Sequence, residues 1–247
     1  MIKIFKDILA SMYYFLKLIF IGKSYDVVFV SSAFFNRAEG GENILLKPMI
    51  ESCIKNNLSY LIFEDTDIKG KYKNFPRNSQ AIRFDFISII QIILRKIFNS
   101  KSRNNLSKDQ LYLNELKISK ILKKIFFRKF HSKIYVTLLW NNITLWRCID
   151  PEACVMDYQH GIIFDGHEES IKDGKPPIIK HRNNIITLVY GDVFKNILIN
   201  NDATGFYSKK NVITVGLKKE SNSQKKSEED IKKILFTLQI VPDWENK

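Results

Sequence analysis

The residues best suited to chemistry stand around His160, in the segment Asp157-Tyr-Gln159-His160-Gly161. Residues 150–170 hold six acidic residues, two of the four histidines and no Lys or Arg, although the chain carries a net charge of +13. An imidazole titrates near neutral pH and can move a proton. A neighbouring carboxylate would orient it and make it more basic. We therefore predict a functional role for His160, with Asp157 or Asp165 as its orienting partner.

The position of His160 supports this prediction, because it follows a hydrophobic run that is typical of a strand. Ligands of open α/β sheets bind outside the carboxyl ends of the strands, and a glycine such as Gly161 lets a backbone approach a ligand closely. The alternative is a histidine that only caps the strand end. His167 is a weaker candidate of the same kind. No metal is predicted, because Asp157, His160, Asp165 and His167 show no ligand spacing of known specificity.

A second candidate is the glycine-bearing loop that precedes a predicted helix, within residues 36–43. Backbone N–H groups at such a helix start can hold an anion or a sugar hydroxyl. The candidate residues are Gly40, Gly41, Glu42 and Asn43. The alternative is a plain turn with a helix cap. The loop matches neither the dinucleotide fingerprint nor the P-loop, so no bound cofactor is predicted.

The elements that must position these residues alternate between strand and helix. Short β-branched or apolar runs predict strands at 25–31, 58–63, 134–139, 153–158, 185–190 and 211–215. Helical spacing predicts helices at 42–55, 84–98, 109–130, 142–149 and 192–200. Strand, helix and strand with short connections define right-handed βαβ units. The fold class is therefore α/β, a Rossmann-like open parallel sheet with helices on both faces.

The chain divides by composition into four parts. An amphipathic helix at 1–23 precedes a Rossmann-like domain at 24–217, and a charged linker is expected at 218–230. Residues 231–247 begin with a new buried-strand pattern. A parallel strand that arrives after a linker has no obvious pairing partner. We expect it to open a second α/β domain that this chain lacks.

Charge and cysteine content narrow the functional classes. The chain has 247 residues, 39 Lys and Arg, 26 Asp and Glu, and three cysteines. Few cysteines and no CxxC exclude a disulfide scaffold and indicate a reduced, cytoplasmic protein. The excess of positive charge favours an anionic partner. Nucleic acid is disfavoured, because no recognised nucleic-acid module accompanies the charge.

Two segments are candidates for contact with a membrane. Residues 1–21 are apolar but contain Lys3, Lys6, Asp7 and Lys17, so they are too interrupted to span a bilayer. They form either an interfacial helix or a helix packed on the domain. Residues 91–133 carry twelve Lys or Arg and two acids. The amphipathic part of this segment either attracts anionic lipid or is a solvated face.

Together these motifs resemble the N-terminal half of GT-B glycosyltransferases of bacterial surface-polysaccharide synthesis. The resemblance rests on Gln159-His160-Gly161, His167, Leu188-Val-Tyr-Gly191-Asp192 and Val212-Ile-Thr-Val-Gly216. The first of these is similar to the QHG element of capsule and polyol-phosphate transferases. The final run Ile234-Leu-Phe-Thr-Leu-Gln239 is similar to the first strand of the nucleotide-sugar domain.

The resemblance implies an enzyme that transfers a sugar from a nucleotide-activated donor to a glycan hydroxyl. His160 would be the general base. Gly40 to Asn43, Gln159, Gly161 and His167 would bind substrate. The missing C-terminal domain would hold the nucleotide sugar, and the protein would lie at the inner membrane face with a glycan or lipid-linked acceptor. The alternatives are a CDP-glycerol-type polyol-phosphate transferase and a non-catalytic acceptor-binding or membrane-docking fragment.

Overall fold

The computed structural model describes residues 2–32, 35, 40–65, 76–99, 106–138, 142–164, 166–168 and 170–216. They belong to one compact unit, Met1–Leu217. Asp165 lies outside the described residues, as do the expected linker at 218–230 and the expected strand at 231–247. The division of the chain predicted beyond residue 217 therefore stays a prediction.

The centre of the fold is one open sheet of parallel strands in the order β3-β2-β1-β4-β5-β6-β7. Every pairing between neighbouring strands is parallel, which confirms the predicted fold class. The strands are β1 (Lys23–Ser32), β2 (Tyr60–Asp65), β3 (Ile82–Arg83), β4 (Phe130–Leu138), β5 (Cys154–Tyr158), β6 (Ile186–Val189) and β7 (Val212–Thr214).

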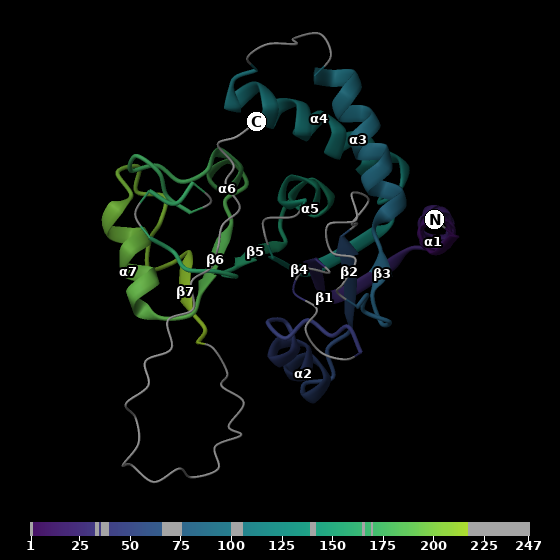
Figure 1. Cartoon of the computed structure of the whole chain (residues 1–247), viewed down its shortest axis with the longest axis horizontal. Coiled ribbons are helices and arrows are strands. Elements are labelled where there is room, and N and C mark those ends of the chain that lie inside the picture. Colours follow the sequence, from purple (N-terminus) through teal and green to yellow (C-terminus); the bar gives the residue numbers. More distant parts are fainter. Residues whose placement is uncertain are drawn as a thin grey trace. The chain divides into compact units, whose positions relative to one another are not determined.

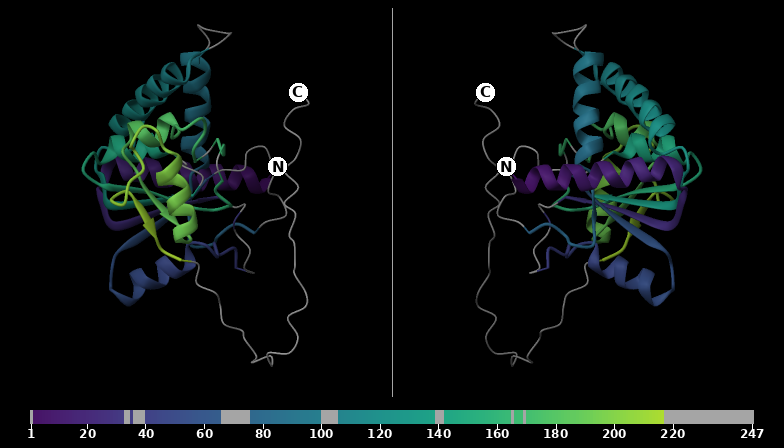
Figure 2. Two further views of the ribbon diagram at one scale, coloured as in Figure 1. Left: turned by 90° about the vertical axis from the view of Figure 1, so that its left-hand side faces the viewer. Right: turned by 90° about the vertical axis from the view of Figure 1, so that its right-hand side faces the viewer.

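Helices cover both faces of this sheet (Figures 1 and 2). They are α1 (Ile2–Phe20), α2 (Lys47–Lys55), α3 (Asp85–Asn99), α4 (Lys108–Ile125), α5 (Ile143–Ile149), α6 (Ile178–Arg182) and α7 (Asp192–Asn201). One apolar layer joins the sheet to α1, α3, α4 and α5, and a second joins it to α2. Because successive strand side chains point to opposite faces, strands between two such layers are apolar throughout.

Several element boundaries differ from the expected ones. Helix α4 ends at Ile125 rather than residue 130, and β4 begins at Phe130 rather than residue 134. Helix α2 begins at Lys47 rather than residue 42, because Asn43 caps a turn first and Pro48 favours the opening turn of a helix. Residues 178–182 form α6, where an irregular segment was expected. The short edge strand β3 was also not predicted, since two residues carry too little pattern to be detected.

Helix α1 is part of the main core. The fully buried ring of Phe15 stacks on Phe63 of β2 with ring centroids 5.8 Å apart. Phe63 stacks in turn on Trp146 of α5, at 5.6 Å. Of the two interpretations of residues 1–21, packing against the domain is therefore the one seen in this fold. No helix among the described residues is both long and apolar enough to cross a bilayer.

The strand order places a topological switch point between β1 and β4. From β1 the chain adds β2 and β3 on one side, and from β4 it adds β5, β6 and β7 on the other. Connections from the two halves leave in opposite directions, so a crevice forms at the carboxyl ends of β1 and β4. Ligands of open α/β sheets bind in that crevice. A ligand site is therefore expected at this edge of the sheet.

Candidate functional site at the carboxyl edge of the sheet

The corner Gln159-His160-Gly161 follows β5 and is tied to the end of β6. The buried Gln159 amide donates to the Gly161 carbonyl oxygen at 2.7 Å and accepts from the Tyr190 backbone N–H at 2.8 Å. The Gln159 backbone N–H donates to the Leu188 carbonyl at 2.8 Å. Gln159 was predicted to bind substrate. In the structure its amide braces the backbone that carries His160.

His160 lies at the switch-point edge and is half-buried. Its imidazole meets the ring of Phe35 edge-on, with centroids 5.6 Å apart. Phe35 follows β1, whereas His160 follows β5, and β4 lies between these two strands. The contact therefore spans the end of β4. A Cβ placed on Gly161 would meet no atom within 4 Å among the described residues, so the corner is open on that side.

Asp157 forms a buried ion pair directly below this corner. Its Oδ2 lies 2.6 Å from Nζ of Lys180 on α6, and both side chains are almost wholly buried. Thr137 of β4 reaches the same carboxylate at 3.5 Å. Lys180 was missed by sequence reasoning because α6 was not predicted. The signal that could have revealed it is the pair Pro176-Pro177 before an apolar residue, since proline marks helix starts.

The remaining predicted residues of this segment lie in the loop after β5. Nδ1 of His167 is 3.1 Å from the Ser170 hydroxyl, and its ring packs on Phe164 with centroids 5.0 Å apart. Asp165 is outside the described residues. Within the part of the chain that the structure describes, no three His, Cys, Asp or Glu side chains gather closely enough to hold a metal ion.

The glycine loop at residues 40–43 has the geometry of a turn with a cap. Gly41 has a φ of +74°, and a Cβ there would lie 2.6 Å from the carbonyl carbon of Arg77. The buried Asn43 accepts from the backbone N–H groups of Leu45 and Leu46 at 3.0 and 3.2 Å. Glu42 pairs with Lys47 at 3.4 Å. These contacts are typical of a plain turn with a cap, which was the alternative to a binding loop.

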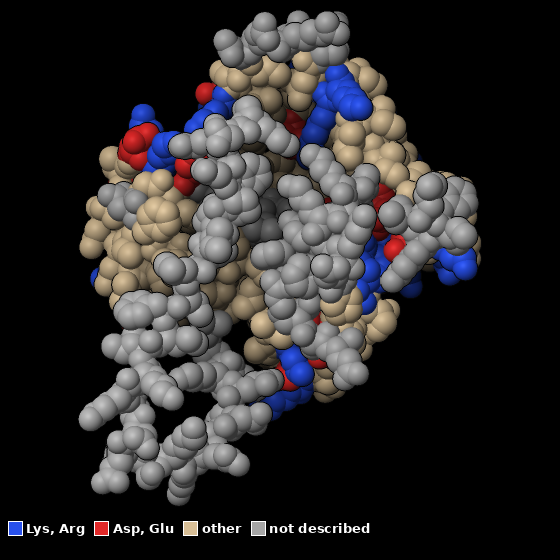
Figure 3. All heavy atoms as spheres, in the orientation of Figure 1, with Lys and Arg blue, Asp and Glu red and all other residues tan. Residues whose placement is uncertain are grey.

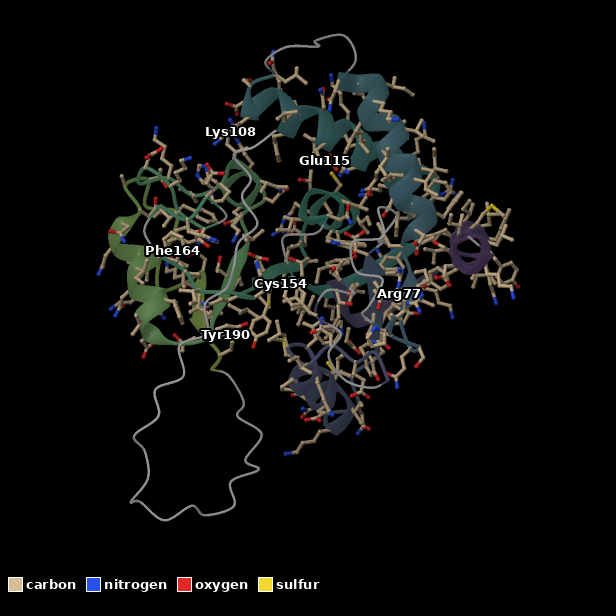
Figure 4. The ribbon with its side chains drawn as sticks, viewed as in Figure 1. Arg77, Lys108, Glu115, Cys154, Phe164 and Tyr190 are labelled. Atoms are coloured by element: carbon tan, nitrogen blue, oxygen red, sulfur yellow. The ribbon has the colours of Figure 1, made fainter. Side chains whose placement is uncertain are left out.

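A cavity of about 720 Å³ lies at the same edge of the sheet, beneath the α3–α4 hairpin. Its walls come from the end of β2, from α3 and α4, and from the first turns of α5 and α6. Lys108 and Glu115 mark its α4 side in Figure 4, where Arg77 lies toward β2 and β3 and Phe164 toward α7. The volume suits a small ligand of several rings.

Polar side chains from four elements converge in this cavity. Gln91 of α3 donates to Asn142 at 2.6 Å, and Asn142 precedes α5 in the left-handed conformation with a φ of +60°. Ser88 donates to Asp65 at 3.3 Å. Non-glycine residues held at positive φ concentrate at functional sites. Asn142 is the one residue of this kind that lines the cavity among the described residues, so the cavity is a candidate site.

Charged and aromatic groups complete the cavity wall. Arg95 forms a two-pronged ion pair with Glu115, with both N–O distances at 2.8 Å. This hydrogen bonding raises the pKa of Arg95 against the opposing effect of burial. Burial raises the pKa of the Tyr112 phenol, so that group stays protonated and can donate or accept. Sequence reasoning missed all these residues, although Gln91 interrupting an apolar helical run was a usable signal.

Comparisons with known proteins give no family. No family model matches the chain, and no curated protein matches it. Among solved structures it is similar to UDP-GlcNAc 2-epimerase from Methanocaldococcus jannaschii, with a TM-score of 0.39 and 13% sequence identity. The match covers 77% of this chain and 45% of that one. The chain thus spans less than half the length of that enzyme, and we transfer no functional residue from it.

Proposed function

We propose that this chain is the acceptor-binding lobe of a GT-B glycosyltransferase that builds a cell-surface polysaccharide. The observation that supports the proposal is that a half-buried imidazole and a polar cavity both lie at the carboxyl edge of one parallel sheet, although His160 itself does not line the cavity. The reaction is transfer of a sugar from a nucleotide-activated donor to a glycan hydroxyl. The nucleotide of the donor would be held by a C-terminal domain, as in the family that the motifs resemble.

His160 is the proposed general base. It would take the proton from the attacking hydroxyl, a contribution of about 10²–10⁴-fold. Asp157 or Asp165 is the proposed orienting carboxylate. The Gln159 hydrogen bonds hold the backbone of this corner, and the ion pair with Lys180 fixes the position of the Asp157 carboxylate. Gly161 and His167 would lie along the path of the substrate, and Gly40 to Asn43 along its opposite rim.

The cavity is the proposed acceptor subsite. Sugar hydroxyls both donate and accept, and the cavity offers both kinds of group in the amides of Gln91 and Asn142 and the carboxylate of Asp65. Tyr112 offers an aromatic face for the C–H groups of a sugar ring. Arg95 pairs with Glu115, and Lys108, Asp65 and Glu168 also line the cavity, so its acidic residues outnumber its basic ones by three to two. This balance favours a neutral sugar over an anionic one.

A binding experiment tests the acceptor subsite without any donor. Ligand-observed NMR of the whole chain with neutral mono- and disaccharides should show contact that Gln91→Ala weakens by at least tenfold. Gln80→Ala, an exposed glutamine outside the cavity, is the matched control and should bind as the parent chain does. Equal binding by both variants would remove the cavity from the proposal.

A transfer experiment tests the base. The chain is assayed with labelled nucleotide sugars and a separately supplied candidate C-terminal domain. His160→Gln should lower turnover by about 10²–10⁴-fold, while His181→Gln, an exposed histidine on α6, should not. Retained turnover in His160→Gln would eliminate the base assignment. Transfer of glycerol phosphate from CDP-glycerol would reassign the donor class, and absence of transfer with any donor would leave a binding lobe only.

A further inference from the structure

Helix α1 has one face in the core and one exposed apolar face. Ser11, Phe15 and Leu18 are buried. Leu9, Tyr13, Leu16 and Phe20 are exposed and follow one another at spacings of four, three and four residues, which places them in one stripe. Tyr13 is 69% exposed and Phe20 is 76% exposed. Packing of α1 on the domain therefore leaves an apolar stripe uncovered among the described residues.

The basic turn that follows α4 lies beside the end of this stripe. The ammonium of Lys129 donates to the carbonyl oxygen of Phe20 at 3.2 Å, and the backbone N–H of Lys23 donates to the carbonyl of Lys129 at 3.0 Å. Arg128 and Lys17 are exposed next to them in the chain. Two features far apart in the sequence, the apolar helix α1 and the basic turn between α4 and β4, thus meet at one corner.

The charge at this corner is mostly basic. Lys17, Lys23, Arg128 and Lys129 are exposed there, and no Asp or Glu occurs in residues 8–25 or in residues 116–149. The nearby acids are engaged in ion pairs, Asp26 with Lys133 and Asp150 with His131. Figure 3 shows basic and acidic side chains together beside the N-terminal end of α1, which is the end in view. An apolar stripe with a predominantly basic rim is complementary to an anionic bilayer, where apolar side chains enter the interface and lysines meet the headgroups.

We propose that the α1 stripe (Leu9, Tyr13, Leu16 and Phe20) and its basic rim (Lys17, Lys23, Arg128 and Lys129) dock this chain on an anionic membrane surface. The proposal rests on the proposed function only in the choice of partner, since a lipid-linked acceptor lies at that surface. It assigns the contact to two chain segments that the fold brings together, with Phe20 as the most deeply inserted side chain.

Vesicle binding tests the proposal directly. The whole chain should co-sediment with vesicles of phosphatidylcholine and phosphatidylglycerol, and much less with phosphatidylcholine alone. Tyr13→Ser with Phe20→Ser should weaken binding by at least tenfold. Lys17→Gln with Arg128→Gln should weaken it by about fivefold per charge removed. Matched controls on α2, Ile54→Ser and Lys55→Gln, should bind as the parent chain does, because they are equally exposed but remote from the stripe.

A second measurement reports insertion. A tryptophan in place of Phe20 should shift its fluorescence to the blue with anionic vesicles and be quenched by brominated lipid. Failure of the parent chain to bind anionic vesicles, or equal binding by the stripe variants and the α2 controls, overturns the proposal. Self-association that the stripe variants abolish, without vesicle binding, also overturns it in favour of a second copy. These measurements use no sugar substrate, so they fail or succeed separately from glycosyl transfer.

Discussion

Two glycine-bearing corners lie at the carboxyl edge of the same sheet, and they serve different purposes. In the loop after β1, the backbone at Gly41 packs against Arg77 and Asn78. That stretch is itself held by the buried Glu64, whose Oε2 accepts from the Asn78 N–H at 2.9 Å. In the corner after β5, a Cβ on Gly161 would meet no atom within 4 Å among the described residues. The first glycine is required by packing, whereas the second leaves room for a ligand.

The polar neighbours of the two glycines differ in the same way. The side-chain oxygen of Asn43 accepts two backbone hydrogen bonds in the turn that leads into α2. The side-chain amide of Gln159 hydrogen-bonds the backbone of Gly161 and Tyr190, and its neighbour in the chain, His160, is half-buried. A glycine with polar neighbours at a strand end is therefore not enough to indicate a site. What distinguishes a site is a supported functional group with free volume next to it.

The largest loss of stability is expected when Asp157, which precedes the corner after β5, loses its buried partner Lys180. Lys180→Met leaves the Asp157 carboxylate buried without its counter-charge, which should lower the free energy of unfolding by about 3–5 kcal/mol. Urea unfolding measures this. Lys133→Met removes an exposed partner of Asp26 and should cost no more than about 1 kcal/mol. Equal losses in the two variants would show that the pair below His160 is no stronger a support than a surface pair.

The second-largest loss of stability is expected at Gly41, in the loop after β1. Gly41→Ala combines a positive φ with a close approach to the Arg77–Asn78 backbone, which Glu64 keeps from moving. We expect a loss of about 3 kcal/mol, read from thermal unfolding. Gly161→Ala should change stability by less than about 0.5 kcal/mol, because its surroundings are open. Similar losses at both glycines would abolish the distinction between the corners.

A smaller loss of stability is expected at Gln159, whose side chain hydrogen-bonds the backbone of the corner after β5. Gln159→Ala leaves the Tyr190 N–H and the Gly161 carbonyl without their partner and should cost about 2 kcal/mol. The exposed Gln80→Ala is the control for stability. In the sugar-transfer assay, Gln159→Ala should also lower kcat with little change in KM. An unchanged kcat would mean that Gln159 stabilises the fold without positioning the imidazole.

The smallest loss of stability is expected at Asn43, which caps the turn in the loop after β1. Asn43→Ala removes the acceptor for two backbone N–H groups and should cost about 1 kcal/mol. Chemical unfolding compares it with Asn196→Ala, an exposed asparagine on α7, which should stay within about 0.5 kcal/mol of the parent chain. Sugar binding is the second measurement on Asn43→Ala. A loss of binding at constant stability would support the proposed place of Asn43 on the substrate rim, and unchanged binding would remove Asn43 from it.

Much of the fold could be predicted from local pattern. The β-branched run at Tyr25 to Ser31 and the helical spacing at Leu116 to Phe130 report burial on one or two faces, and burial follows directly from residue type. Helix α6 and strand β3 escaped prediction because five and two residues are too short to show a period. His160 was found because a single titratable residue at a strand end is itself a local signal.

The sequence by itself determined the class of fold, the parallel sheet and the position of one histidine at its carboxyl edge, because these depend on hydrophobic periodicity along a continuous stretch. Only the tertiary structure decided that Asp65, Gln91, Glu115 and Asn142 share one cavity, that Asp157 meets Lys180, and that Lys129, in the turn after α4, bonds to Phe20 at the end of α1. Those meetings depend on strand order and helix packing, which bring together residues that no local pattern connects.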